Sequence, residues 1–220
     1  MRGDFIPDHR SPEDARFASG LFFSWGWRMK QIKIGDPNDP ESEMGPIAMK
    51  RQLDRVEGYI QKGVDEGATL YSGGQRPAHL NRGYYIEPTL FTDVTNDMTI
   101  AREEIFGPVL ALIKAKDLDD AIEIANETTY GLNSSVLSND RQAVYDVGRK
   151  LRAGNVGMNG LKADFNLPFG GFKQSGLGRE GANEAGLRSF LETKTMLIEV
   201  EAASPADEIK AAELAAETTG

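Results

Sequence analysis

The sequence predicts an α/β protein with an open, mostly parallel sheet and flanking helices. Short apolar runs alternate along the chain with helical patterns, which is the arrangement of parallel strands joined by helices. Hydrophobic residues make up 40% of the chain and charged residues 27%, as in an ordinary globular protein. A chain of 220 residues is also long enough to bury one substantial core.

The regular elements begin after a divergent N-terminal segment, residues 1–31, which fits neither a helix nor a strand. A helix over 48–66 is predicted by apolar side chains spaced three and four residues apart, namely Leu53, Val56, Ile60 and Val64. Gly67 ends this helix, and "ATLYSGG" follows as a short strand. The stretch "GYYIEPTLFTDV" is expected to form an edge strand, because Pro88 cannot donate a hydrogen bond to a neighbouring strand.

Two strand and helix units follow. The apolar run 109–116 predicts a strand, and Asp117 is expected to cap the helix after it. "LNSSVLS" is a further strand, Asn139 or Asp140 caps a second helix, and "NVGMN" is the next strand. The inward faces of the two helices are predicted to consist of Ala121, Ile122 and Ala125 in the first, and Val144, Val147 and Leu151 in the second.

The C-terminal part is predicted to contain one more helix and one more strand. The helix covers 180–192, and "KTMLIEV" supplies the strand. Residues 201–220 are rich in Ala and Glu and lack apolar periodicity, so we expect a disordered tail.

The charge and the hydrophobicity pattern limit the possible partners. The net charge is −9, which leaves no basic field for a nucleic-acid backbone. No apolar stretch approaches the roughly 20 residues needed to span a bilayer. The acidic N-terminal segment is also unlike the basic start of a secretory signal. We therefore expect a cytoplasmic protein without nucleic-acid or membrane partners.

Cysteine is absent from the chain, which excludes a thiol nucleophile and a thiolate metal site. The only histidines are His9 and His79, and a lone histidine in a polar loop is usually a surface residue. From these residues we assign no catalytic residue and no metal ligand.

A G-x-G-x-x-G pattern spans Gly176–Gly181. In dinucleotide-binding folds this pattern follows a strand and opens a helix, whose N-terminus holds the pyrophosphate. Gly181 does precede a helical stretch here, but the residues just before Gly176 are too polar and glycine-rich for a buried strand. A glycine loop that brings two backbones close together is the favoured interpretation.

Three stretches resemble conserved segments of the aldehyde dehydrogenase superfamily. "PFGGFKQSGLGREG" resembles a C-terminal loop of these enzymes, and Glu103–Pro108 matches their E-E-x-F-G-P motif. "IGDPNDPESEMGPI" matches their G-D-P…G-P segment, and the order and separations also fit. The resemblance covers about residues 32–200. It implies the family's catalytic-domain fold, with 32–194 as a partial catalytic domain and 195–200 as a strand that adds to a partner subunit's sheet.

The resemblance implies oxidation of an aldehyde with NAD or NADP as the cofactor. Glu104 would hold the nicotinamide ribose, because one carboxylate can accept hydrogen bonds from both hydroxyls. Phe106 would pack beside the nicotinamide ring. Phe169 would form a wall of the aldehyde pocket, with Phe165 and Asp164 in a variable loop that tunes substrate choice. Apart from the resemblance, Glu104 is interpreted as a turn residue and Phe169 as a core residue.

The sequence departs from the family at the nucleophile. The family uses a cysteine thiolate, and counting back from Gly35 places Phe5 at that position and Arg10 at the arginine that follows it. Phenylalanine has no lone pair with which to attack a carbonyl. The family's N-terminal cofactor domain also has no counterpart before Met1. We therefore expect a truncated chain that is inactive on its own.

Three hypotheses remain open on the sequence alone. The first is a portion of an aldehyde dehydrogenase catalytic domain, either a truncated remnant or one piece of a split enzyme. The resemblance also implies a homo-oligomer or pairing with a full-length relative. The second is a non-catalytic subunit that pairs with a full-length relative through 195–200. The third is a free-standing dinucleotide binder built on Gly176–Gly181.

Overall fold

The computed structural model describes residues 6–7, 26–161 and 164–198 of the chain. These residues belong to two compact units, Met1–Ser189 and Phe190–Gly220, which are treated separately below. The candidates Phe5, His9 and Arg10 lie outside the described residues, as do most of the aromatic cluster before Trp27 and the tail 201–220.

The main sheet of the larger unit has four strands in the order β1–β4–β3–β2. The strands are β1 (Ile6–Pro7), β2 (Thr69–Ser72), β3 (Thr89–Val94) and β4 (Val109–Ala115). Both β1 and β3 run parallel to β4, and β2 is antiparallel to β3. This arrangement confirms the open, mostly parallel sheet that the sequence predicts.

Two short sheets follow in the same unit. Strands β5 (Tyr130–Gly131) and β8 (Phe172–Lys173) pair antiparallel, whereas β6 (Asn133–Val136) and β7 (Asn155–Met158) pair parallel. The helices are α2 (Lys50–Asp65), α3 (Thr99–Arg102), α4 (Leu118–Asn126), α5 (Arg141–Lys150) and α6 (Glu184–Arg188). Residues 26–31 are also helical. The divergent N-terminal segment therefore contains a strand and a helix that its apolar spacing did not predict.

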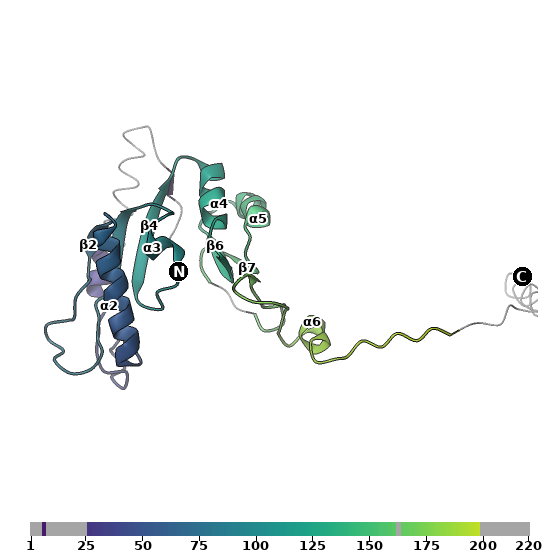
Figure 1. The fold of residues 1–220 in the computed structure, drawn as a ribbon, viewed down its shortest axis with the longest axis horizontal. Helices are drawn as coiled ribbons and strands as arrows, with labels where there is room; N and C mark the ends of the chain where they lie inside the picture. Colours follow the sequence, from purple (N-terminus) through teal and green to yellow (C-terminus); the bar gives the residue numbers. More distant parts are fainter. Residues whose placement is uncertain (1–5, 8–25, 162–163, 199–220) are drawn as a thin grey trace, which may run out of the picture. The chain divides into compact units, whose positions relative to one another are not determined.

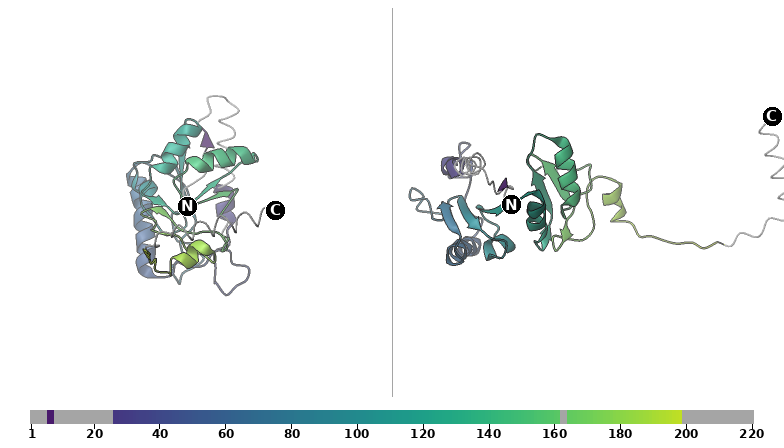
Figure 2. Two further views of the ribbon diagram at one scale, coloured as in Figure 1. Left: turned by 90° about the vertical axis from the view of Figure 1, so that its right-hand side faces the viewer. Right: turned by 90° about the horizontal axis from the view of Figure 1, so that it is seen from above.

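The main core lies between α2 and the four-stranded sheet (Figures 1 and 2). Leu53, Val56 and Ile60 face this core as predicted, but Val64 is 43% exposed. In the last turn of α2, Gly63 faces the core instead of Val64. A Cβ on Gly63 would lie 3.0 Å from the ring of Phe91, so the missing side chain makes room for that phenylalanine. Gly67, at φ +94, ends the helix as expected.

Strand β3 corrects the expectation of an edge strand broken by proline. It lies between β4 and β2, and five of its six residues are buried. Pro88 stands just before the first strand residue, where a missing N–H does not interrupt the ladder. The buried hydroxyl of Thr89 accepts from Gly74 N and donates to Glu87 O, so its polar group is satisfied.

The two helices after β4 begin at the predicted caps. The Asp117 carboxylate accepts from Asp120 N, and α4 buries Ile122. Ala125 is exposed, contrary to prediction. The next residue, Asn126, instead hydrogen-bonds Lys150 O and Arg152 N, which ties the end of α4 to the end of α5. On α5 the predicted inward residues are buried or half-buried, namely Val144, Val147 and Leu151.

Asp140, and not Asn139, is the cap of α5. Its carboxylate accepts from the backbone N–H groups of Gln142 and Ala143 at 2.8 and 3.2 Å. Asp140→Ala should therefore lower the free energy of unfolding by about 1 kcal/mol, measured by urea denaturation. Asn139→Ala is the matched control and should leave it nearly unchanged. Equal losses in the two variants would contradict the assignment.

The C-terminal elements are shorter than predicted. The helix expected over 180–192 is reduced to α6, because Glu180 pairs with Phe169 and the backbone of Gly181 packs against Gly186. In the second unit, residues 192–198 form no strand. An isolated extended segment has no neighbouring backbone to complete a ladder. The role of 195–200 as an oligomerisation strand therefore stays a prediction.

Candidate functional site

Glu104 and Phe106 lie on the loop between α3 and β4. Ile105 between them is 8% exposed and belongs to the main core, whereas the Phe106 ring is 72% exposed. Phe106 adopts φ +55, a left-handed conformation that costs roughly 1–3 kcal/mol for a residue with a side chain. The surrounding structure must therefore hold this loop in place.

Helix α2 supplies the side chains that hold the loop. The amide of Gln52 donates to the carbonyl oxygens of Ile105 and Phe106, at 2.9 and 3.0 Å. The guanidinium of Arg55 donates to the carbonyl oxygen of Glu104 at 2.7 Å. Three consecutive carbonyls of the loop are thus bonded to one helix, which compensates for the strained backbone at Phe106.

Gly107 closes the loop against the same helix. A Cβ at this position would lie 2.4 Å from a methyl group of Val56, which is fully buried. The order Ile-Phe-Gly therefore has a local physical reason. The isoleucine enters the core, the phenylalanine points outward, and the glycine lets the chain pass close to α2.

The sequence alone does not point to Gln52, Arg55 or Tyr59 as site residues. They are spaced three and four residues apart, beside the apolar stripe of α2. This spacing places polar side chains on one side of a helix and is the signal that could have revealed them.

The two neighbouring glutamates of this loop have different environments. The Tyr59 hydroxyl donates to the Glu103 carboxylate at 2.5 Å, and Arg55 donates to the same hydroxyl at 3.2 Å. The Glu104 side chain is exposed, and no hydrogen bond or ion pair with the other described residues engages its carboxylate. Glu103 therefore has a structural role, whereas the carboxylate of Glu104 is exposed and has no partner among the described residues.

The hydrogen bond to Glu103 raises the pKa of Tyr59 above its usual value, and burial of the ring acts in the same direction. A raised pKa means that the folded state favours protonated tyrosine. The stability from this pair is therefore fully present below the unfolded tyrosine pKa of about 10. It is lost as the pH rises through the folded pKa.

Tyr59→Phe should lower the free energy of unfolding by about 1–3 kcal/mol at neutral pH, because the Glu103 carboxylate loses its donor. The variant should also lose less stability than the parent chain between neutral and alkaline pH. Urea denaturation at both pH values measures the two effects. Tyr145→Phe, at an exposed position, is the control and should behave like the parent. An unchanged alkaline response in Tyr59→Phe would contradict the role assigned to this hydroxyl.

The second predicted group, Asp164, Phe165 and Phe169, lies on the loop between β7 and β8. Phe169 pairs with Glu180 through two backbone hydrogen bonds of 2.8 Å, and its side chain is 36% exposed. Phe165 is 82% exposed and accepts a backbone hydrogen bond from Ala182. Without the family resemblance, Phe169 is expected to be a core residue. Its exposure shows that it does not lie in the core.

Asp164 has a local role in the same loop. Its carboxylate accepts from the backbone N–H and the side-chain amide of Asn166, at 2.9 and 3.1 Å. No hydrogen bond, ion pair or cation–π contact recorded for the described residues joins this loop to Glu104 or Phe106. Residues 164–169 and residues 103–107 therefore form two separate groups of candidate residues.

The G-x-G-x-x-G segment does not have the strand-to-helix geometry of a dinucleotide site. Its glycines follow the two-residue strand β8, and Leu177 within it is fully exposed. The helix after it, α6, has five residues and starts at Glu184. The backbone of Gly181 lies close to the carbonyl oxygens of Phe165 and Leu167 instead. The structure supports a glycine loop that brings backbones together.

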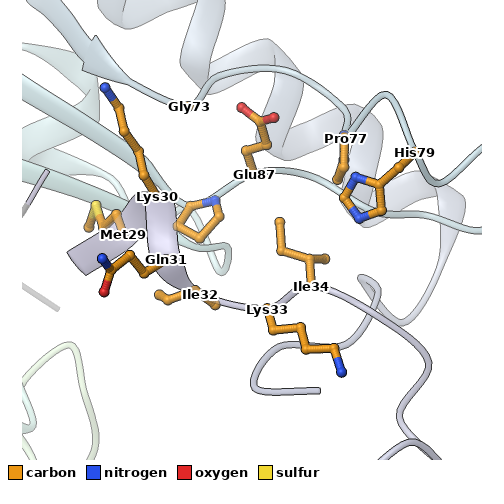
Figure 3. Close-up of a pocket in the computed structure, with 11 residues that line it drawn as sticks. Met29, Lys30, Gln31, Ile32, Lys33, Ile34, Gly73, Pro77, His79 and Glu87 are labelled. Carbon is orange, nitrogen blue, oxygen red and sulfur yellow. The ribbon is translucent and has the colours of Figure 1, made fainter. Parts of the chain in front are cut away.

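A surface hollow of about 440 Å³ lies elsewhere, next to the helical residues 26–31 (Figure 3). Lys30, Lys33 and His79 at this hollow are exposed, and Glu87 is half-buried. Pro77, Pro88, Ile32 and Ile34 supply apolar surface. None of the predicted site residues lines it, and it contains no pair of acid and base at hydrogen-bonding distance. The hollow is therefore not the candidate active site.

No group of three or more His, Asp or Glu side chains is arranged to hold a metal ion within 6–7, 26–161 and 164–198. In the same residues, no helix has the length and hydrophobicity of a membrane span.

Comparisons with known proteins place these motifs in one family. The sequence model of the "Aldehyde dehydrogenase family" matches residues 25–196. A protein of Staphylococcus aureus (strain USA300), named "Putative aldehyde dehydrogenase", is 46% identical over 170 residues. The match covers 77% of this chain and 36% of the relative. A relative from Staphylococcus saprophyticus is 47% identical, and that match also covers 77% of this chain and 36% of the relative. The chain thus spans about a third of the length of these relatives.

Solved structures show the same likeness in three dimensions. The aldehyde dehydrogenase of Mycobacterium tuberculosis, complexed with NAD+, matches with a TM-score of 0.79 and 40% identity, over 91% of this chain and 40% of that one. A mutant of aldehyde dehydrogenase C from Pseudomonas syringae, complexed with NAD+ and octanal, matches with a TM-score of 0.80 and 39% identity. That match covers 86% of this chain and 38% of the other.

Proposed function

Because the chain belongs to the aldehyde dehydrogenase family, we propose that it forms one wall of the nicotinamide and aldehyde sites of such an enzyme. We propose further that it does not oxidise aldehydes by itself. The reaction class is oxidation of an aldehyde to an acid with NAD(P) as the hydride acceptor.

The observation that carries the proposal is the contrast between the two neighbouring glutamates. The Tyr59 hydroxyl engages Glu103, whereas Glu104 presents an exposed carboxylate on a loop that α2 fixes. Such a carboxylate can accept from two vicinal ribose hydroxyls. The exposed Phe106 ring on the same loop offers a flat apolar surface to a nicotinamide ring.

These residues fit only one end of a dinucleotide. The glycine segment 176–181 does not supply a helix N-terminus for the pyrophosphate, because α6 is too short and starts after it. We propose NAD as the cofactor because the two solved relatives described above are NAD+ complexes. The remaining contacts to the cofactor would come from polypeptide that these 220 residues do not contain.

The proposed inactivity of the isolated chain rests on its lack of cysteine. The family's covalent mechanism needs a thiolate that bonds to the carbonyl carbon, so that hydride can leave to the nicotinamide. No sulfur nucleophile exists in this sequence, and methionine sulfur cannot be deprotonated. A productive assembly must therefore receive its nucleophile from another polypeptide segment.

The test is a spectrophotometric assay of NADH formation by the purified chain with NAD+ and a series of aldehydes, octanal included. We expect no formation above the rate of a blank. Saturation-transfer NMR with NAD+ should show weak contact of the nicotinamide ribose, and Glu104→Ala should remove it. Glu123→Ala, at an exposed position on α4, is the control. Clear turnover, or ribose contact that survives Glu104→Ala, would contradict the proposal.

A second candidate function is that of a subunit that pairs with a full-length relative. The supporting observation is an apolar segment of the second unit, where Met196, Leu197 and Ile198 are 73%, 95% and 74% exposed. A β-prone segment with an unpaired backbone is suited to strand addition. Light scattering of the chain, alone and with the Staphylococcus aureus relative, should then show an assembly that Leu197→Lys disrupts. A monomer under all conditions would argue against this role.

A further inference from the structure

The segment 99–106, which contains the two candidate residues of the nicotinamide site, is bonded to α2 from one end to the other. As the residue numbers rise along the segment, those of its partners on α2 fall, so the two pieces of chain run in opposite directions. In this order the partners are Glu66, Tyr59, Arg55 and Gln52. The last three hold the loop after α3, whereas Glu66 bonds the first residue of α3.

Glu66 bonds Thr99 through both oxygens of its carboxylate. One oxygen accepts from the backbone N–H of Thr99 at 2.6 Å, and the other accepts from the Thr99 hydroxyl. In the described chain Met98, the residue before α3, makes no side-chain hydrogen bond to the helix that it precedes. A short polar residue at this place ordinarily satisfies the first N–H groups of a helix. Glu66 therefore supplies from α2 the cap that α3 lacks in its own sequence.

The place of Glu66 on its own helix is electrostatically unfavourable. Glu66 is the residue that ends α2. The C-terminal end of a helix carries partial negative charge and disfavours a carboxylate, whereas the N-terminal end favours one. The contact with α3 therefore gives a physical reason for a glutamate here that α2 alone does not. Asp65 beside it differs, because its carboxylate accepts from the Gln61 amide of the same helix at 2.8 Å.

Helix α3 is suited to transmit a shift of its first residue to the loop. It has four residues, and Glu103 alone separates it from Glu104. A helix this short has few hydrogen bonds of its own, so its geometry depends on its neighbours. Ile100 of α3 is buried in the main core. A Cβ on Gly63 of α2 would lie 3.0 Å from the δ-methyl group of Ile100, so the two helices are in close contact.

We propose that Glu66 is a positioning residue for the nicotinamide site. By capping α3 it fixes where the following loop holds the Glu104 carboxylate and the Phe106 ring. The inference rests on the proposed function, because it assigns a further residue to the same site. It extends the support of that site from Gln52, near the start of α2, to the opposite end of the helix.

Four variants isolate this contact. Glu66→Ala removes the cap, and Thr99→Val removes the hydroxyl but keeps the backbone N–H. Thr99→Ser keeps both donors and should behave like the parent. Asp65→Ala is the matched control, since it removes from the same end of α2 a carboxylate that bonds within α2. Urea denaturation establishes that each variant is folded under the conditions used.

The first measurement uses the chain without cofactor. The amide of Glu103 donates to the Thr99 carbonyl oxygen at 2.9 Å, so its hydrogen exchange reports opening of α3. In Glu66→Ala this amide should exchange roughly fivefold to tenfold faster. The amide NMR signals of Glu104 and Phe106 should also shift. A contact that only stabilises the fold as a whole would lower the urea midpoint but leave these two signals of the folded chain unchanged.

The second measurement is a titration with NAD+, followed through the amide signals of Glu104 and Phe106. Apparent affinity falls with the fraction of molecules in which a binding site is correctly formed. We therefore expect NAD+ to bind roughly fivefold or more weakly to Glu66→Ala. Thr99→Val should show an intermediate loss, and Thr99→Ser and Asp65→Ala should bind like the parent.

The possible outcomes separate the inference from the proposed function. Parental signals and parental NAD+ affinity in Glu66→Ala would overturn the positioning role and leave the proposed function standing. Equal changes in Glu66→Ala and Asp65→Ala would also overturn it. Shifted Glu104 and Phe106 signals in Glu66→Ala, with a parent chain that does not respond to NAD+, would support the coupling of Glu66 to the loop and contradict the proposed function. If Glu66→Ala unfolds, Thr99→Val decides by the same criteria.

Discussion

Phe91→Ala is expected to lower the free energy of unfolding by about 3–5 kcal/mol. The Phe91 side chain is fully buried in the middle of β3. Its ring lies against Gly63, whose missing side chain leaves space for it. Truncation would remove the transfer free energy of the ring and leave a cavity that α2 cannot fill without moving.

The measurement is urea denaturation followed by circular dichroism. A domain of this size is stable by only about 5–15 kcal/mol, so the variant should unfold at a much lower urea concentration. Phe190→Ala is the matched control, because that ring is 86% exposed in the second unit. It should shift the midpoint little. A small effect at Phe91 would mean that the core between α2 and the sheet contributes little to stability.

Gly154→Ala is expected to have the second largest effect, about 1–3 kcal/mol or more. A Cβ at this position would lie 1.7 Å from the carbonyl oxygen of Gly170. Both partners are backbone, so no side-chain rotation can relieve the contact. The substitution should therefore separate the start of β7 from the loop that contains Phe169.

Hydrogen exchange and urea denaturation together test this prediction. The amides of Phe169 and Glu180, which pair with each other, should exchange faster in Gly154→Ala. Gly58→Ala is the control, since its added Cβ would meet nothing within 4 Å on α2. It should raise the free energy of unfolding by about 0.5–1 kcal/mol through helix propensity. A Gly154→Ala variant with parental stability and exchange would disprove the close backbone contact.

The candidate site could be predicted only in part. The motif Glu103–Pro108 pointed to Glu104 and Phe106 through a family resemblance, whereas composition and periodicity alone did not. The sequence did not reveal the roles of Gln52, Arg55 and Tyr59. Their hydrogen-bond partners are backbone carbonyls and a carboxylate that lie roughly fifty residues further along the chain. When the partners are so far apart in the sequence, the only local signal of these roles is the spacing of the polar residues along α2, and that signal is weak.

The sequence by itself determined the local elements. Apolar spacing located α2, an uninterrupted apolar run located β4, and short acidic side chains located the starts of α4 and α5, because these signals act within one or two turns of chain. The absence of cysteine also excluded a thiolate chemistry without any coordinates.

Only the tertiary structure decided which elements cover one another. It placed β3 inside the sheet, gave the last inward position of α2 to Gly63 and left Val64 exposed. It also distinguished Glu103, bound to Tyr59, from Glu104, whose carboxylate is exposed. These outcomes depend on contacts between residues far apart in the sequence, and burial and hydrogen bonding are properties of the packed chain.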